Sequence, residues 1–310
     1  MSLDTRQAAY DYCAAFTQAR VEHFPVASRF LNKKLRRFIA VIYTFARQAD
    51  DIADEGVQSP QERLEQLEYY EGALARLAKS LDAADKPQQD ESASENLRHD
   101  DRVHTHTLIT HQPVFTALMG LFEAYPQLPH TLFFDLLHAF KQDVSKNRYA
   151  NTQELLDYCR YSAHPIGRLL LYLNHQESDA HFAASDAICS SLQRINCVHD
   201  IYSDLLERNR CYMPLDALEA QGLSLDIIRH APDHPQLLLF LQTQLTEIEE
   251  SLAHGSVLAQ LPGAFGFQIR LVLQSAWYML QRLKNRKNLK KSIQLGAFAW
   301  ALIFVRSLNT

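Results

Sequence analysis

Two short polar patterns constrain the fold of this chain more than any other feature of its sequence. In each, polar residues recur every three or four positions within a mainly apolar segment, which is the spacing of one face of an α-helix. Each pattern ends in two aspartates four residues apart, a pairing that destabilises an isolated helix by about 0.2–0.5 kcal/mol. Two such pairs therefore predict a cation held between two helices. The first pattern is Tyr43, Arg47, Asp50 and Asp54, and the second is Gln193, Asn196, Asp200 and Asp204.

Helical spacing of apolar residues runs through most of the chain, and glycine is rare, with 9 in 310 residues. We therefore predict an all-α protein: a single-domain helical bundle over residues 1–290, followed by a C-terminal apolar helix at 291–310. Residues 82–101 are polar and lack periodicity, so we expect an exposed insertion there. Helices are predicted at 34–55, 61–82, 112–125, 129–146, 151–163, 167–174, 181–208, 224–230, 234–254 and 264–286.

Charge and composition narrow the choice of partners. The net charge of −5 makes nucleic acid a poor partner, since phosphate binding needs a basic surface. The first residues show no secretory signal, so we expect a cytoplasmic protein. A basic cluster at 282–291 precedes an apolar stretch at 292–305, which is too short to span a bilayer. This stretch either packs on the core or makes a peripheral contact with the inner membrane.

The aspartate pairs indicate a particular chemistry. Magnesium prefers oxygen ligands and commonly joins one or two carboxylates to the phosphate oxygens of a substrate. Two facing helices with two carboxylates each can hold such ions across a central cavity. We therefore predict several Mg²⁺ ions, bound together with a diphosphate, at Asp50, Asp54, Asp200 and Asp204.

Cationic and hydroxyl side chains accompany both pairs. Arg47 lies one turn before Asp50 and can reach a diphosphate oxygen. In the second pattern, either Arg208 or Arg210 can take this role. Tyr43 and Tyr212 add hydroxyl groups at the same end of the site.

The residues around both patterns resemble a known family. Residues 43–56, YTFARQADDIADEG, resemble the first aspartate-rich motif of the squalene/phytoene synthases, and residues 193–204 with the following RCYMP at 210–214 resemble the second. The resemblance covers about residues 10–280. It implies the isoprenoid synthase fold, with magnesium as cofactor and a prenyl diphosphate ionised in an apolar central cavity.

Within this family, three segments are most similar to the hydroxysqualene synthase branch of hopanoid biosynthesis: residues 24–28, 141–149 and 158–168. Condensing relatives usually carry valine at the position of Ser162 and glycine at that of His164. The resemblance implies that presqualene diphosphate loses diphosphate and captures water to give hydroxysqualene, without NADPH.

Two alternatives stay open at this point. One is the head-to-head condensation of two prenyl diphosphates, such as farnesyl diphosphate, as in squalene or phytoene synthases. The other is an inactive relative that serves as an assembly subunit, which the intact aspartate pairs disfavour.

The resemblance also assigns individual roles. Tyr158 matches a tyrosine with an active-site role, so Tyr158 and Tyr43 are predicted to be catalytic. His23 stands where the branch usually has asparagine. The link between Asp204 and Arg210 is one residue longer than usual, which leaves both arginines as candidates. The predicted substrate-binding residues are Arg47, Asp51, Gln193, Asn196, Arg208, Arg210, Tyr212, His23 and Ser28.

Overall fold

The computed structural model describes residues 3–19, 31–84 and 112–308, and it confirms the predicted all-α class. The chain forms two compact units. The first comprises residues Met1–Val21 and Asn32–Val144, and the second comprises Glu22–Leu31 and Ser145–Thr310. Most of the predicted insertion at 82–101 lies outside the described residues. The predicted domain boundary at residue 290 stays a prediction.

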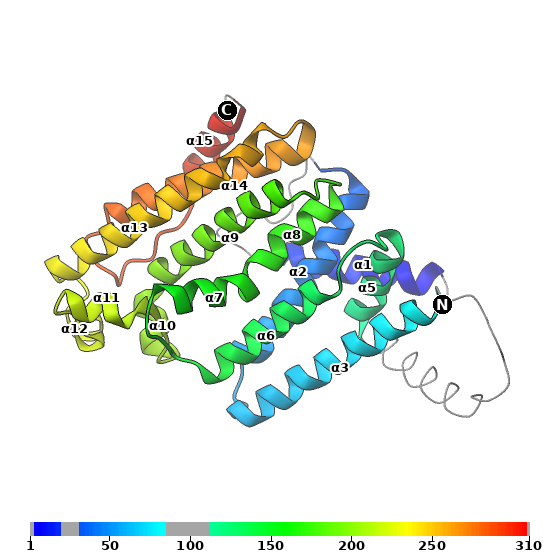
Figure 1. The fold of residues 1–310 in the computed structure, drawn as a ribbon, viewed down its shortest axis with the longest axis horizontal. Helices are drawn as coiled ribbons and strands as arrows, with labels where there is room; N and C mark the ends of the chain where they lie inside the picture. Colours follow the sequence, from blue (N-terminus) through cyan, green and yellow to red (C-terminus); the bar gives the residue numbers. More distant parts are fainter. Residues whose placement is uncertain (1–2, 20–30, 85–111, 309–310) are drawn as a thin grey trace. The chain divides into compact units, whose positions relative to one another are not determined.

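The first unit is a set of helices around an aromatic core. Helix α1 packs against α2 and α5, and α2 also contacts α3 and α5 (Figure 1). In the core, the ring of Phe45 lies 5.1 Å from that of Tyr70 and 5.2 Å from that of Phe133. The elements are α1 (Leu3–Gln18), α2 (Lys33–Asp54), α3 (Pro60–Ala84), α5 (Pro113–Ala124) and α6 (Thr131–Ser145).

The second unit is built around α9, which contacts α8, α13 and α14, while α15 packs along α14 (Figure 1). A short parallel pair, β1 and β2, pairs Arg148 with Cys211 and Tyr149 with Pro214. The elements are β1 (Arg148–Tyr149), α7 (Thr152–Ser162), α8 (His164–Leu173), α9 (Asp179–His199), α10 (Ile201–Glu207), β2 (Cys211–Pro214), α11 (Leu215–Ala220), α12 (Leu225–His230), α13 (Pro235–Gly255), η1 (Ser256–Gln260), α14 (Gly263–Lys284) and α15 (Ala297–Leu308).

Two predicted helices differ from the structure. The helix predicted at 181–208 is wrong as one continuous element, because α9 ends at His199 and α10 begins at Ile201. The helix predicted from Gly167 begins earlier, at His164. Pro165 lies in its first turn, where the missing amide hydrogen costs no hydrogen bond. Gly167 allows α8 to lie close to α9, since a Cβ there would lie 2.2 Å from the Ser185 hydroxyl and that side chain would have to turn away.

Candidate active site

The first aspartate-rich pattern lies on α2, a helix whose start is fixed by a side chain. The Asn32 side chain accepts a hydrogen bond from the Leu35 amide, which caps the helix. The apolar face of α2 is buried in the first unit, and this burial leaves the polar pattern on the remaining surface. Tyr43, Arg47, Asp50 and Asp54 are each partly exposed.

Arg47 is held among three carboxylates, two on α2 and one on the residue that directly follows it. Its Nε lies 2.7 Å from Asp51, and its two terminal nitrogens lie 3.2 Å from Asp50 and 3.1 Å from Glu55. These contacts fix the guanidinium beside the aspartate pair. Asp51 therefore positions Arg47, and its predicted contact with substrate stays a prediction.

Asp50 lies in an environment that disfavours its negative charge. Burial, and next the charge of Asp54, raise the pKa of Asp50 to about 7, with smaller increases from Asp143 and Asp51, while Arg47 opposes the shift. The side chain still keeps 32% of its surface exposed. A divalent cation would relieve the repulsion between these carboxylates, so the first pattern suits a magnesium ligand set.

Asp143 is an acidic neighbour to which sequence reasoning gave no role. It is buried on α6 in the first unit, at 5% exposure, and its charge acts on Asp50. The sequence did contain an indication of its role, because Asp143 is a carboxylate within an apolar helix and lies in the 141–149 segment that resembles the hydroxysqualene synthases.

The second pattern spans a break between two helices. Asp200 caps the end of α9, and backbone hydrogen bonds from Asp200 to Asn196 and from Asp204 to Asp200, both 2.8 Å, keep a turn-like spacing across the break. Gln193 and Asn196 are half-buried, and the Asn196 side-chain oxygen is buried without a hydrogen-bond partner among the described residues. Such an oxygen is a suitable acceptor for an ion-bound water or a ligand.

The C-terminal part of the chain positions Asp200, a contribution that sequence reasoning missed. Nδ1 of the buried His199 lies 2.5 Å from Asp200, and its Nε2 lies 3.1 Å from the Ile293 carbonyl. Arg286 donates to the His199 carbonyl at 2.8 Å. Burial lowers the pKa of Arg286, and the charge of Asp200 opposes that shift.

The two candidate arginines have different environments. Arg208 lies beside Asp204, with its Nη1 3.3 Å from the carboxylate and its side chain 36% exposed. Arg210 is buried and donates to the Tyr212 hydroxyl at 3.1 Å. Asn209 between them has a φ of 50°, a left-handed conformation that asparagine tolerates. This turn accommodates the longer link between Asp204 and Arg210.

Three tyrosine rings gather where β1, β2 and α7 meet. The rings of Tyr149 and Tyr158 are 5.5 Å apart, and that of Tyr212 is 5.4 Å from each. All three side chains are buried. The structure thus brings the predicted residues Tyr158 and Tyr212 together and adds Tyr149, which had no predicted role.

The remaining predicted residues are not all in described segments. His23 and Ser28 lie outside the described residues. The first pattern belongs to the first unit and the second pattern to the second unit. Across the described ranges, no group of three or more histidine, cysteine, aspartate or glutamate side chains is arranged to hold a metal ion. Each aspartate pair would therefore need further oxygen ligands, which a diphosphate supplies.

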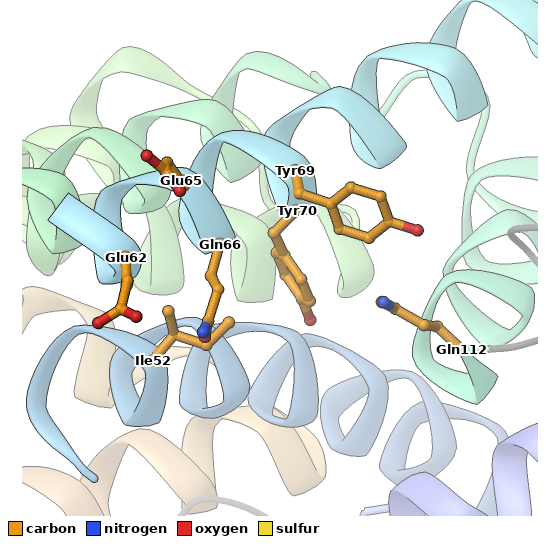
Figure 2. A pocket seen from close by; sticks show the side chains of 7 residues that line it. All are labelled: Ile52, Glu62, Glu65, Gln66, Tyr69, Tyr70 and Gln112. Atoms are coloured by element: carbon orange, nitrogen blue, oxygen red, sulfur yellow. The ribbon is translucent and has the colours of Figure 1, made fainter. Parts of the chain in front are cut away.

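A separate polar pocket in the first unit lies away from the aspartates. It lies between α2 and α3, and Gln112 at the start of α5 also lines it (Figure 2). Ile52 is its α2 residue, and it follows Asp50 by two positions, which is about 200° around the helix. The pocket therefore faces away from Asp50 and Asp54. Its lining is Ile52, Glu62, Glu65, Gln66, Tyr69, Tyr70 and Gln112.

Comparisons with known proteins identify the family of this chain. The family profile described as squalene/phytoene synthase matches residues 18–298. The hydroxysqualene synthase of Sinorhizobium fredii is 34% identical over 279 residues, which cover 89% of this chain and 84% of the relative. The 15-cis-phytoene synthase of Enterobacter agglomerans is 27% identical over 278 residues, covering 89% and 83%.

Among solved structures, squalene synthase HpnC from Alicyclobacillus acidocaldarius has a TM-score of 0.74 at 26% identity, covering 94% of this chain and 98% of that one. The fold, the motifs and these relatives define a helical enzyme that processes a prenyl diphosphate. The chain belongs to the squalene/phytoene synthase family.

Proposed function

We propose that this enzyme converts presqualene diphosphate to hydroxysqualene, with loss of diphosphate and capture of water. The observation that carries the proposal is the 34% identity to a hydroxysqualene synthase along 89% of the chain, together with complete aspartate pairs. Water ends the reaction rather than hydride, so we expect no need for NADPH.

In this proposal each aspartate pair is a set of magnesium ligands. Asp50 and Asp54 in the first pattern, and Asp200 and Asp204 in the second, hold Mg²⁺ ions. When bound, Mg²⁺ neutralises the charge that develops on the departing diphosphate. Arg47 and Arg208 each lie beside a motif carboxylate and bind diphosphate oxygens.

The tyrosine cluster supplies the other half of the chemistry. Loss of diphosphate leaves a carbocation, and aromatic faces attract cations. Tyr158 and Tyr212 present buried rings beside Tyr149, so we propose that this cluster stabilises the cation while it rearranges. Tyr43, one turn before Arg47, contributes a hydroxyl group near the diphosphate end.

Head-to-head condensation of two prenyl diphosphates is the second candidate. Its support is the 27% identity to a phytoene synthase over nearly the same part of the chain, and the fold shared with a squalene synthase structure. The same aspartates and arginines would serve either reaction, so the substrate decides between them.

Product analysis tests the choice. We expect purified enzyme with Mg²⁺ to turn presqualene diphosphate into hydroxysqualene whose oxygen comes from isotopically labelled water, and to need no NADPH. Removal of Mg²⁺ with a chelator should stop turnover. Farnesyl diphosphate alone should give no product, and its conversion to a condensed product would favour the second candidate.

We also propose that the protein makes a peripheral contact with the cytoplasmic face of the inner membrane. None of the described helices is long and apolar enough to span a bilayer. Helix α15 buries Ala299, Ile303 and Ser307, and its other side exposes an apolar stripe. Exposed basic residues precede this helix, and they suit an anionic lipid surface. The stripe is Phe298, Ala301, Phe304, Val305 and Leu308, and the basic residues are Arg282, Lys287, Lys290 and Lys291.

Vesicle binding checks this proposal. Phe298→Glu combined with Val305→Glu should lower the partition onto anionic phospholipid vesicles by about tenfold or more, because burying each apolar side chain contributes ~1.5–3 kcal/mol. The matched control is Val57→Glu, which changes a fully exposed valine in the first unit and should leave binding unchanged. Equal binding by the double variant and the wild type would dismiss the contact.

A further inference from the structure

The side chains of a serine, a histidine and an aspartate are in contact between α8 and α9. His164 Nε2 lies 2.7 Å from the Ser190 hydroxyl, and His164 Nδ1 lies 3.4 Å from Asp186. Arg168 holds both carboxylate oxygens of Asp186, at 3.0 and 2.6 Å. The carboxylate beside Nδ1 favours a proton on that nitrogen, so Nε2 accepts from Ser190.

The two α9 members of this group lie on the helix face that carries the second aspartate-rich pattern. On α9, Asp186, Ser190 and Gln193 are spaced by four and three residues, and Asn196 and Asp200 continue that spacing. Ser190 precedes Asp200 by ten residues, which is about 15 Å along the helix. The group therefore lies on the same helix face as Asp200 but away from the proposed diphosphate end.

The electrostatic setting suits proton acceptance. Burial lowers the pKa of His164, the charge of Asp186 opposes this shift, and Arg168 and Arg160 add to it. The charged groups that face the imidazole thus come from α7, α8 and α9. A neutral imidazole can take a proton, and Asp186 lies where it would stabilise the resulting imidazolium.

Two buried polar atoms on α7 and α9 lack a hydrogen-bond partner among the described residues and suit an ordered water. The Ser162 hydroxyl, at the end of α7 and two residues before His164, is buried without a hydrogen-bond partner among the described residues. The Asn196 side-chain oxygen on α9 is also buried without a hydrogen-bond partner among the described residues. Buried polar atoms of this kind are normally satisfied by ordered water.

The arrangement is not that of a serine hydrolase. Ser190 lies in the middle of α9, where backbone amides are already bonded within the helix. Acyl transfer needs amide or side-chain donors for an oxyanion, and a mid-helix serine has no such backbone donors beside it.

We propose that Ser190, His164 and Asp186 form a relay that removes the proton from the water that captures the carbocation. The inference rests on the proposed function. A lone pair of the water forms the C–O bond, and the protonated alcohol gives one proton to the Ser190 oxygen as the Ser190 proton moves to His164 Nε2. The positive charge ends on the imidazolium beside Asp186, which then returns its proton to solvent. Ser190 touches the water, and His164 and Asp186 act through it.

The ratio of alcohol to hydrocarbon products formed from presqualene diphosphate tests the relay. In Ser190→Ala and His164→Ala, we expect diphosphate release within about threefold of wild type, because ionisation does not use the relay. The share of product that is hydroxysqualene should fall about tenfold, and hydrocarbons formed by proton loss from carbon should replace it, as expected when a general base is removed. Ser190→Thr keeps the hydroxyl and should restore the alcohol share.

The pH dependence separates this role from a structural one. The alcohol share should fall on acidification in the wild type, as His164 becomes protonated, and should stay flat in His164→Ala. Because the share is a ratio of products, it does not depend on the rate of ionisation. His181→Ala is the matched control, since His181 also lies on α9 but its ring bonds a backbone carbonyl, that of Gln176, at 3.0 Å.

The outcomes are distinct. A wild-type enzyme that makes no hydroxysqualene from presqualene diphosphate would overturn the proposed function and the relay together. A wild type that makes it, with an unchanged alcohol share in Ser190→Ala, would overturn the relay alone. If His164→Ala fails to fold, Ser190→Ala decides, since it removes only one oxygen atom.

Discussion

Asp50→Asn and Asp200→Asn are each expected to lower turnover of presqualene diphosphate by about 1,000-fold, which corresponds to ~4 kcal/mol of transition-state stabilisation. Each substitution keeps the size of the side chain but removes a negative oxygen from a proposed ion site. Helix content by circular dichroism should match the wild type. Asp157→Asn is the control, because this aspartate is exposed on α7, where it accepts a hydrogen bond from Gln153, and it should not affect turnover.

Thermal stability gives an independent reading of the Asp50 variant. The pKa of Asp50 is about 7 in the folded protein and near 3.8 when unfolded, so the unfolded chain loses this proton more readily as the pH rises. In the absence of metal, the free energy of unfolding therefore falls as the pH rises from about 3.8 to about 7, because the Asp50 carboxylate becomes charged. Above pH 7 this loss of stability is complete.

An asparagine side chain cannot ionise, so Asp50→Asn should raise the melting temperature of the metal-free protein at about pH 8 by roughly 2 °C or more, after allowance for solvent screening at a partly exposed site. Mg²⁺ with inorganic diphosphate should raise the melting temperature of the wild type by mass action but not that of the variant. A variant that keeps both turnover and this shift would remove Asp50 from the metal site.

The sequence predicted the fold class well because the helices carry their own periodic signal. The α2 prediction of 34–55 differs from the observed Lys33–Asp54 by one residue at each end. The break at Asp200 carried no such signal, since the apolar spacing continues across it. The gap predicted between the helices at 151–163 and 167–174 is not a break, because α8 begins at His164. Pro165 fits the first helical turn, and Gly167 allows close contact with α9.

The candidate site was predictable where its residues share a helix face. Arg47 and Asp50, three residues apart on α2, lie within 3.2 Å of each other, and the predicted contact of Arg47 with diphosphate stays a prediction. Contacts between distant segments were not predictable in this way. Asp143 acts on Asp50 from another helix, and Arg286 bonds the His199 carbonyl across 87 residues. A single sequence has no local spacing that reports such pairs.

Arg208→Ala is expected to lower kcat/KM by about 100-fold, or ~3 kcal/mol, because it removes a charge-assisted contact to diphosphate. Its melting temperature should stay within about 2 °C of the wild type, since contacts of partly exposed ion pairs contribute little to stability. Arg208→Lys keeps the charge but not the two-pronged geometry, and it should recover part of the activity.

Arg210→Ala should behave in the opposite way. Arg210 is 6% exposed and bonds the Tyr212 hydroxyl, so its loss leaves a cavity and a buried hydroxyl beside the tyrosine cluster. We expect the melting temperature to fall by about 4 °C or more, for ~2 kcal/mol of lost stability. If Arg210→Ala instead lost activity with an unchanged melting temperature while Arg208→Ala stayed active, the diphosphate contact would belong to Arg210. The exposed arginine beside Asp204 would then serve only to orient that carboxylate.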